Sequence, residues 1–305
     1  MGNFLIRRLW QTGLLLVAVT VLVFLLVLLS GDPVRAFVPI DASPADVENI
    51  RHQYGLDLPM WQQYVLFVQH AAAGDLGQSF KFREPAIGLV LERLPLTAAL
   101  AFASLLVTII VAVPLGMLAA THRGSVWDQA ATLVSMLSVS VPSFWLGILM
   151  ILLFAGELRW VPPSGSAQLS SLILPTLTLS AQPIGLLTRL VRTSMIEETR
   201  RGYLTTARAK GIAEPLVMFH HALRNALIPI VTVLGLQLGA LLGGSVIVET
   251  VFAWPGVGWL LIQAISAHDL PLLRANVLVI ALLFVTINTL TDILYAYLNP
   301  RIRFT

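Results

Sequence analysis

The sequence contains no cysteine and only two lysines, Lys81 and Lys210. The absence of cysteine excludes disulfide bonds, thiolate metal ligands and cysteine nucleophiles. Neither lysine lies in a GxxxxGK[ST] sequence, so the chain has no phosphate-binding P-loop of its own. HExxH and GxSxG are absent as well. We therefore expect a chain that is not an enzyme, binds no metal and holds no cofactor.

Charged residues are also scarce, while hydrophobic residues are abundant. Charged residues make up 11% of the 305 residues and hydrophobic residues 57%. The mean hydropathy of +0.83 is typical of a membrane protein. A helix needs about 20 apolar residues to cross a bilayer. Continuous apolar runs favour α-helices over the alternating strands of a barrel. Six spans are predicted, at 9–29, 96–120, 130–154, 172–192, 227–250 and 274–297.

Basic residues predict the orientation of these spans. Twelve of them fall at the two ends and in the 121–129 and 189–226 loops, whereas the short loops of the other side carry only Arg159 and Arg274. Because basic loops stay in the cytoplasm, both termini are predicted to be cytoplasmic. The net charge of +3 reflects this bias and does not indicate nucleic acid.

The N-terminal run has two interpretations. Arg7 and Arg8 precede the apolar stretch 14–29, as in a secretory signal peptide. However, Ser30-Gly-Asp-Pro33 is not a small-x-small cleavage site. We therefore predict that residues 1–29 are a retained transmembrane helix.

Residues 30–95 are predicted to form an external, periplasmic segment. Helices are expected from Ser43-Pro44 to Gly55, from Met60 to Ala73 with Gly74 ending it, and from Pro85 to Leu94. In the second helix one face carries Trp61, Tyr64, Val65 and Val68, which indicates packing on the membrane surface or on the bundle. The segment either contacts a partner or is a passive lid.

Two of the core spans contain unusual polar or proline residues. Pro142 lies among serines in the third span and predicts a bent helix. The fourth span is expected to face other helices or a pathway because it carries polar residues that lipid would not favour, namely Thr176, Thr178, Ser180 and Gln182.

The fifth span has glycines at four-residue spacing, Gly235, Gly239 and Gly243, which allow another helix to approach closely. That helix belongs either to this chain or to a second membrane subunit, across a seam that Gln237 is placed to hydrogen-bond. Glu249 is expected to reach water at the outer end of the span. Residues 250–259 follow as an external turn whose tryptophans suit the membrane interface.

Asp292 in the sixth span lies one turn beyond Asn288. An intramembrane carboxylate suggests either a structural hydrogen bond or an ion site. The second alternative would make the chain a secondary transporter. No convincing internal repeat of the kind expected for such transporters is visible, so the structural role is favoured.

The most polar stretch runs from Tyr203 to Gly211 and on to Pro229. It predicts a helix that ends at Gly211 and a second short helix that starts at Glu214-Pro215. Such a helix-turn-helix between two spans is either a docking element for another protein or an ordinary charged loop.

The motif at 205–211 resembles the cytoplasmic EAA motif of bacterial ABC importer permeases, with Thr205-Thr206-Ala207 in place of Glu-Ala-Ala and with the glycine at Gly211. The run TARAKG…HALRNALIP is similar to the dipeptide/oligopeptide/nickel permease branch. So are GDP at 31–33, GDLGQSF at 74–80, RLPLT at 93–97, PSFW at 142–145, LLGGSVIVETVFAWPGVG at 241–258 and the ending from Asp292 to Arg303.

This resemblance implies an all-α type I importer permease with a core at 96–305, an additional N-terminal helix and a periplasmic insertion. Its partners would be a homologous second permease, two cytoplasmic ATPases that bind ATP and Mg²⁺, and a periplasmic or lipid-anchored binding protein, in a bacterial inner membrane. Its cargo would be dipeptides or short oligopeptides, or alternatively nickel, metal chelates or glutathione. The loop 193–226 would dock the ATPase through a motif comprising Thr205, Thr206, Ala207, Arg208, Ala209, Lys210, Gly211, Ile212 and Glu214.

Overall fold

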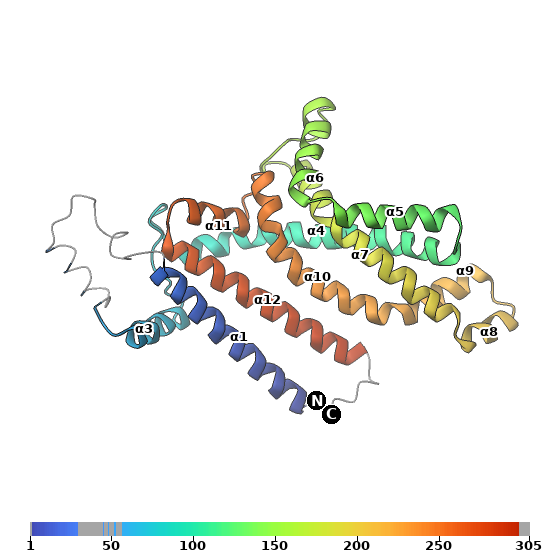
Figure 1. Ribbon diagram of the computed structural model, residues 1–305, viewed down its shortest axis with the longest axis horizontal. Coiled ribbons are helices and arrows are strands. Elements are labelled where there is room, and N and C mark those ends of the chain that lie inside the picture. The colour runs from blue at the N-terminus through green and yellow to red at the C-terminus, as the bar shows by residue number, and fades with distance from the viewer. Residues whose placement is uncertain (1, 30–44, 46–47, 49–51, 53–56, 299–305) are drawn as a thin grey trace. The chain divides into compact units, whose positions relative to one another are not determined.

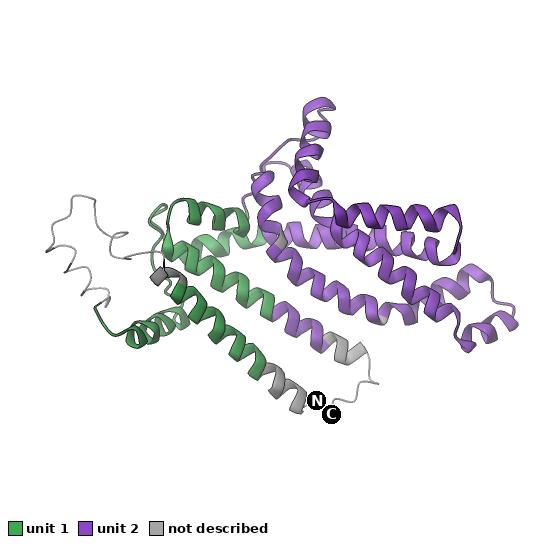
Figure 2. Ribbon diagram, in the orientation of Figure 1, with its two compact units in different colours: residues 1–95, 256–285 green, residues 96–255, 286–305 purple. Residues whose placement is uncertain are grey.

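The computed structural model describes residues 2–29, 45, 48, 52 and 57–298 (Figure 1). Apart from an isolated antiparallel bridge between Gln78 and Pro85, the regular structure of these residues is helical. The chain forms two compact units, Met1–Pro95 with Gly256–Val285 and Leu96–Pro255 with Thr286–Thr305 (Figure 2). Of the helix predicted between Ser43 and Gly55 only Ala45, Glu48 and His52 are described, and all three are helical. The basic tail lies outside the described residues.

The first unit holds α1 (Gly2–Leu29), α3 (Met60–Ala72) and α11 (Val257–Ser266). It also includes residues 86–95 of α4 (Ala86–Thr121) and residues 270–285 of α12 (Leu270–Leu298). The predicted helix from Met60 is confirmed, and Gly74 follows it with a left-handed φ of 81°. The side chains predicted to share one face of α3 have different surroundings. Tyr64 lies 5.5 Å from the ring of Phe24 on α1, whereas Trp61 is 66% exposed.

A buried aspartate organises the loop of this unit. Asp269 is 1% exposed and precedes α12, where its Oδ1 accepts a hydrogen bond from the Leu272 amide. Its Oδ2 accepts bonds from the Ser79 hydroxyl at 2.5 Å and from the Lys81 amide at 3.1 Å. Asp269 therefore caps a helix and fixes the 79–81 loop with one carboxylate.

Two predictions about element boundaries were wrong. The helix expected at 85–94 and the second span form a single helix, α4, of 36 residues. Pro95 does not end it, because an internal proline removes only one backbone hydrogen bond and is tolerated in membrane helices. The end of the predicted external turn, from Val257, is already part of helix α11 (Val257–Ser266), and Trp254 in that turn is only 4% exposed because it packs within the chain.

The third predicted span is not one bent helix but two. α5 (Val126–Ser140) and α6 (Ser143–Met150), which continues as a π-helical segment at Ile151–Glu157, meet at an angle of 102°. Pro142 is the physical reason. A residue before proline avoids the helical region, and Val141 is extended, with φ −86° and ψ 122°. Figure 1 shows α6 turning away from α5.

The second unit is built around α7 (Ile173–Thr199), which a 3₁₀ turn, Leu169–Leu172, precedes. It contacts α5, α6 and α10 (Leu223–Val251). Thr176, Thr178 and Ser180 are buried, which confirms that the polar fourth span faces other helices. Gln182 differs from them because it is exposed.

The described residues account for fewer than the six predicted spans. Three helices among them are long and apolar enough to cross a membrane, and five if the bent pairs α5–α6 and 214–243 each count as one span. In α1 the described apolar stretch is the shorter segment Trp10–Leu25. The sixth span remains a prediction.

Glu249 does not reach water as expected. It is fully buried, and the Thr97 hydroxyl of α4 donates a 2.8 Å hydrogen bond to its Oε1. The two residues join α4 to the last turn of α10, and nearby the Trp254 indole donates to the Leu96 carbonyl at 3.1 Å.

We expect Thr97→Val to destabilise the protein by about 1–3 kcal/mol, because the isosteric change removes a donor from a buried carboxyl group. Thr121→Val on the same helix is the control, because Thr121 is exposed and its hydroxyl donates to backbone carbonyls in the last turn of α4. The measurement is thermal unfolding in detergent. Equal midpoints for the two variants would contradict the role of Thr97.

Candidate coupling site

Two short helices follow α7 at one end of the second unit (Figure 1). They are α8 (Gly202–Ala209) and α9 (Glu214–Leu216), and a π-helical segment, Val217–Ala222, leads into α10. α8 is anchored by Leu204 and Ala207, which are buried in a cluster with side chains of α4, α7 and α10. The predicted helix-turn-helix is therefore present and is fixed to the helical core by its apolar side.

The end of α8 confirms the prediction for Gly211. This glycine has a φ of 77°, in the left-handed region that other residues adopt at a cost. Its amide bonds to the Arg208 carbonyl at 2.9 Å, and the Ile212 amide bonds to the Ala207 carbonyl at 3.4 Å. These two bonds are those of a Schellman motif, which satisfies carbonyls at a helix C-terminus.

An ion pair closes the turn between α8 and α9. Arg208 donates from Nε and Nη2 to the two carboxylate oxygens of Glu214, at 2.9 and 2.8 Å. The hydrogen bonds from Arg208 lower the pKa of Glu214 and, reciprocally, raise that of Arg208. A bidentate pair fixes both position and direction, so the turn around Gly211 has a defined shape.

Tyr203 ties the start of α8 to both neighbouring helices. Its hydroxyl donates to Glu198 at the end of α7, at 2.7 Å, and accepts from Asn225 of α10, at 2.9 Å. Burial and the hydrogen bond to Glu198 raise the pKa of the Tyr203 hydroxyl. Movement of α8 is thereby linked to α7 and α10.

Most of the predicted motif residues are presented to solvent. Thr205, Thr206, Arg208, Ala209, Lys210, Gly211 and Glu214 are exposed, whereas Ala207 is buried and Ile212 is half-buried. Ala207 and Ile212 therefore anchor the turn. Two apolar residues that sequence reasoning missed, Leu216 and Phe219, are 59% and 66% exposed beside it. In the sequence, both could have been noticed as apolar residues within the most polar loop.

The glycines of α10 do not share one environment. A Cβ at Gly235 would overlap the Thr291 side chain of α12, so this glycine permits close packing within the chain. Gly239 is buried and Gln237 is half-buried. Gly243 is exposed, with no atom within 4 Å of where its Cβ would be.

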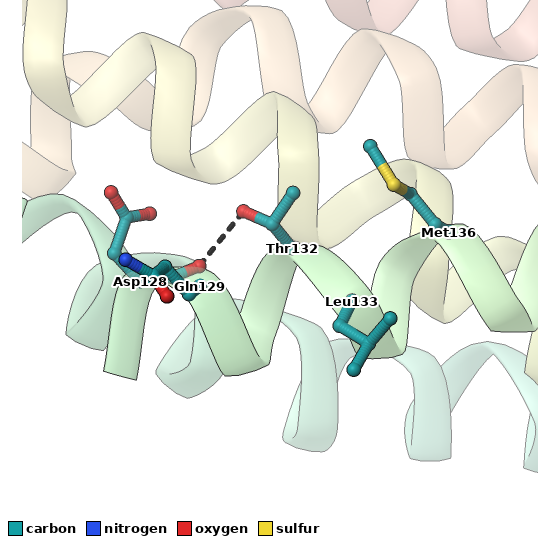
Figure 3. Close-up of a pocket in the computed structure, with 5 residues that line it drawn as sticks. All are labelled: Asp128, Gln129, Thr132, Leu133 and Met136. Atoms are coloured by element: carbon teal, nitrogen blue, oxygen red, sulfur yellow. Dashed lines mark hydrogen bonds between the residues drawn. The ribbon is translucent and has the colours of Figure 1, made fainter. Parts of the chain in front are cut away.

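A part-buried ion pair that the sequence did not indicate joins α5 to α7. Arg192 donates to the two Asp128 oxygens, from Nε at 2.5 Å and from Nη2 at 2.8 Å, and the Gly124 amide also donates to Asp128. Asp128 lies at one end of a shallow groove along α5, lined also by Gln129, Thr132, Leu133 and Met136 (Figure 3). The carboxylate is engaged by Arg192, so the groove presents no free catalytic acid.

The described residues contain no group of three or more His, Cys, Asp or Glu that could hold a metal ion. The chain is a helical membrane protein, and its fold is known from solved structures. It is similar to solved inward-facing conformations of the MetNI methionine ABC transporter, with a TM-score of 0.61 at 20% identity, covering 71% of this chain and 99% of that one. A second crystal form of MetNI gives 0.59.

The chain belongs to the family of binding-protein-dependent transport system inner membrane components. Residues 112–304 match that family, and residues 1–101 match the N-terminal domain described as "Binding-prot-dependent transport system membrane comp, N-term". The protein is thus a multi-pass permease subunit of an ABC importer in the inner membrane, without catalytic activity of its own. Its partners are ATPases, which bind the ATP, and a binding protein.

Curated relatives match the chain from end to end. The glutathione transport system permease protein GsiC of Escherichia coli O6:H1 (strain CFT073) is 40% identical over 305 residues, which is the whole of both chains. The proteins of the same name from Escherichia coli (strain K12) and Shigella flexneri serotype 5b (strain 8401) are each 39% identical over the same length.

Proposed function

We propose that the protein forms half of the translocation pathway of an importer for glutathione or a closely similar short peptide. The observation that carries this proposal is identity of 40% over the full length of a glutathione permease. It favours the glutathione alternative over the broader expectation of dipeptides and oligopeptides, and over nickel chelates.

The complex proposed around it contains a homologous second permease, two ATPases on the cytoplasmic side and a periplasmic or lipid-anchored binding protein. Both termini would be cytoplasmic, as the basic loops suggest. The exposed Gly243 supports a seam with the second permease in the outer half of α10, whereas Gly235 packs on Thr291 of the same chain.

In this complex the turn at 205–214 would be the coupling element. Its exposed face, Thr205, Thr206, Lys210 and Gly211, would enter a cleft of an ATPase together with the apolar Leu216 and Phe219. Closure of the ATPases would then move α8, and the bonds of Tyr203 to α7 and α10 would carry that movement to the membrane helices.

Substrate uptake tests the proposal directly. Cells that express this chain with the ATPases, second permease and binding protein encoded beside it should accumulate labelled glutathione, and a large excess of a neutral dipeptide should not compete. Uptake of the dipeptide without uptake of glutathione would contradict the proposal. A secondary transporter based on Asp292 is not proposed, because the family works with ATPases.

A further inference from the structure

Gln182 is an exposed amide in the middle of a membrane helix. None of the described hydrogen bonds involves it, and its side chain is exposed on α7. It lies ten residues from either end of the predicted span 172–192, about 15 Å at 1.5 Å per residue, in a hydrocarbon core about 30 Å thick. Polar groups at this depth face a bundle interior or a water-filled cavity and not lipid.

Three more exposed residues continue from Gln182 along the same face of α7. Leu186, Arg189 and Thr193 follow at intervals of four, three and four residues, and we name these four residues the α7 stripe. Other faces of α7 are covered within the chain. Gly185 lies so close to α5 that a Cβ would meet the Ser135 carbonyl oxygen at 2.5 Å, and Val191 packs equally closely on Gly116 of α4.

The exposed stripe of α4 provides the contrast within the same unit. There Phe102, Leu106 and Ile110 are 60%, 58% and 61% exposed, and all three are apolar, as a surface against lipid requires. The residues of the α7 stripe are exposed as well, but three of the four are polar. The difference in chemistry indicates that the two surfaces face different media.

The charge of the α7 stripe suggests what passes along it. Arg189 donates a 3.4 Å hydrogen bond to the Gly185 carbonyl, and no ion pair among the described residues includes it. The next exposed acid on this face, Glu197, lies beyond the end of the predicted span. A cation of this kind complements a short peptide with more carboxylates than ammonium groups, which glutathione is.

We propose that the α7 stripe lines the cytoplasmic half of the translocation pathway, where Gln182 hydrogen-bonds the main chain of the peptide and Arg189 attracts its carboxylates. The identity of the peptide rests on the proposed function, whereas the location of the pathway does not. The alternative occupant of the stripe is a helix of the second permease.

Thiol labelling tests the location. The chain is naturally free of cysteine, so Gln182→Cys and Thr193→Cys introduce single thiols, with Ile110→Cys on the α4 stripe as the control. The complete importer in inside-out vesicles is treated with a membrane-impermeant thiol reagent during ATP turnover. The first two thiols should react at least about ten times faster than the control, because a thiolate forms in water and not in hydrocarbon. Labelling of position 182 at the rate of position 110 would overturn the proposal.

Transport kinetics test the role of the charge. Arg189→Gln should raise the KM for glutathione about tenfold with little change in kcat, as expected for loss of a charge-assisted contact, and Arg189→Lys should restore most of it. Arg200→Gln, an exposed arginine just after α7, is the matched control. An equal rise in KM for both glutamine variants would overturn the role of Arg189. If the wild-type importer does not move glutathione, the proposed substrate is wrong, and the labelling result still decides the pathway.

Discussion

Gly211→Asp will abolish uptake and the coupling of ATP hydrolysis to the binding protein, while the chain remains in the membrane at its normal level. The φ of 77° at Gly211 costs a residue with a side chain about 1–2 kcal/mol, and the new carboxylate would stand on the surface proposed to enter the ATPase. No atom lies within 4 Å of the new Cβ, so the damage should be confined to this surface. Uptake and ATPase rates in proteoliposomes measure the effect.

Gly74→Asp is the matched control for Gly211→Asp. Gly74 has a φ of 81° and equally open surroundings, and it also follows the end of a helix, but that helix is α3 in the first unit. The two variants therefore share the same backbone strain and the same added charge. If Gly74→Asp abolishes coupling to the same degree, strain is responsible and the docking role of Gly211 is lost.

Asp128→Asn is expected to have the largest effect on stability, a loss of about 2–3 kcal/mol. Removing Asp128, the buried partner of this bidentate pair, leaves the Arg192 charge uncompensated, and Arg192 at 30% exposure recovers only part of its hydration. Thermal unfolding of the detergent-solubilised importer, followed by tryptophan fluorescence, measures the loss.

Two further variants separate the ion pair from other consequences of Asp128→Asn. Replacing both Asp128 and Arg192 with leucine should cost less than replacing Asp128 alone, since no buried charge is then left unpaired. Arg201→Gln, at the exposed 3.7 Å contact with Glu198, should shift stability by less than about 1 kcal/mol. A loss of stability in the double leucine variant equal to the sum of the losses in Asp128→Leu and Arg192→Leu would show that the two charges do not interact.

Periodicity and turn chemistry predicted several elements correctly because they act within a few residues of the chain. Met60–Ala72 and Gly202–Ala209 form the expected helices, with left-handed glycines at Gly74 and Gly211 just after them. Pro142 was recognised as a point of bending, but its effect was underestimated. The angle of 102° requires that both halves, α5 and α6, find separate packing on α7, which depends on residues distant in the sequence.

The coupling turn could be predicted from the sequence in its position but not in its internal contacts. The left-handed Gly211 and the start of a helix at Glu214 follow from local backbone preferences. Which of its residues are exposed does not, because Ala207 is buried only through packing on α4, α7 and α10. The exposure of Leu216 and Phe219 likewise became visible only when the surrounding helices were in place.

The sequence alone was sufficient for the membrane class, for the absence of a P-loop and for the helix-turn-helix that begins at Gly202, because composition, missing motifs and local turn chemistry do not depend on long-range contacts. The tertiary structure decided the partners of the buried charges. Glu249 is paired with Thr97 and Asp128 with Arg192 across 152 and 64 residues of chain. It also decided that Gly235 faces Thr291 while Gln182 faces outward. The physical reason is that a polar side chain in a membrane helix is satisfied by whichever helix packs against it, and that helix is selected by the fold as a whole.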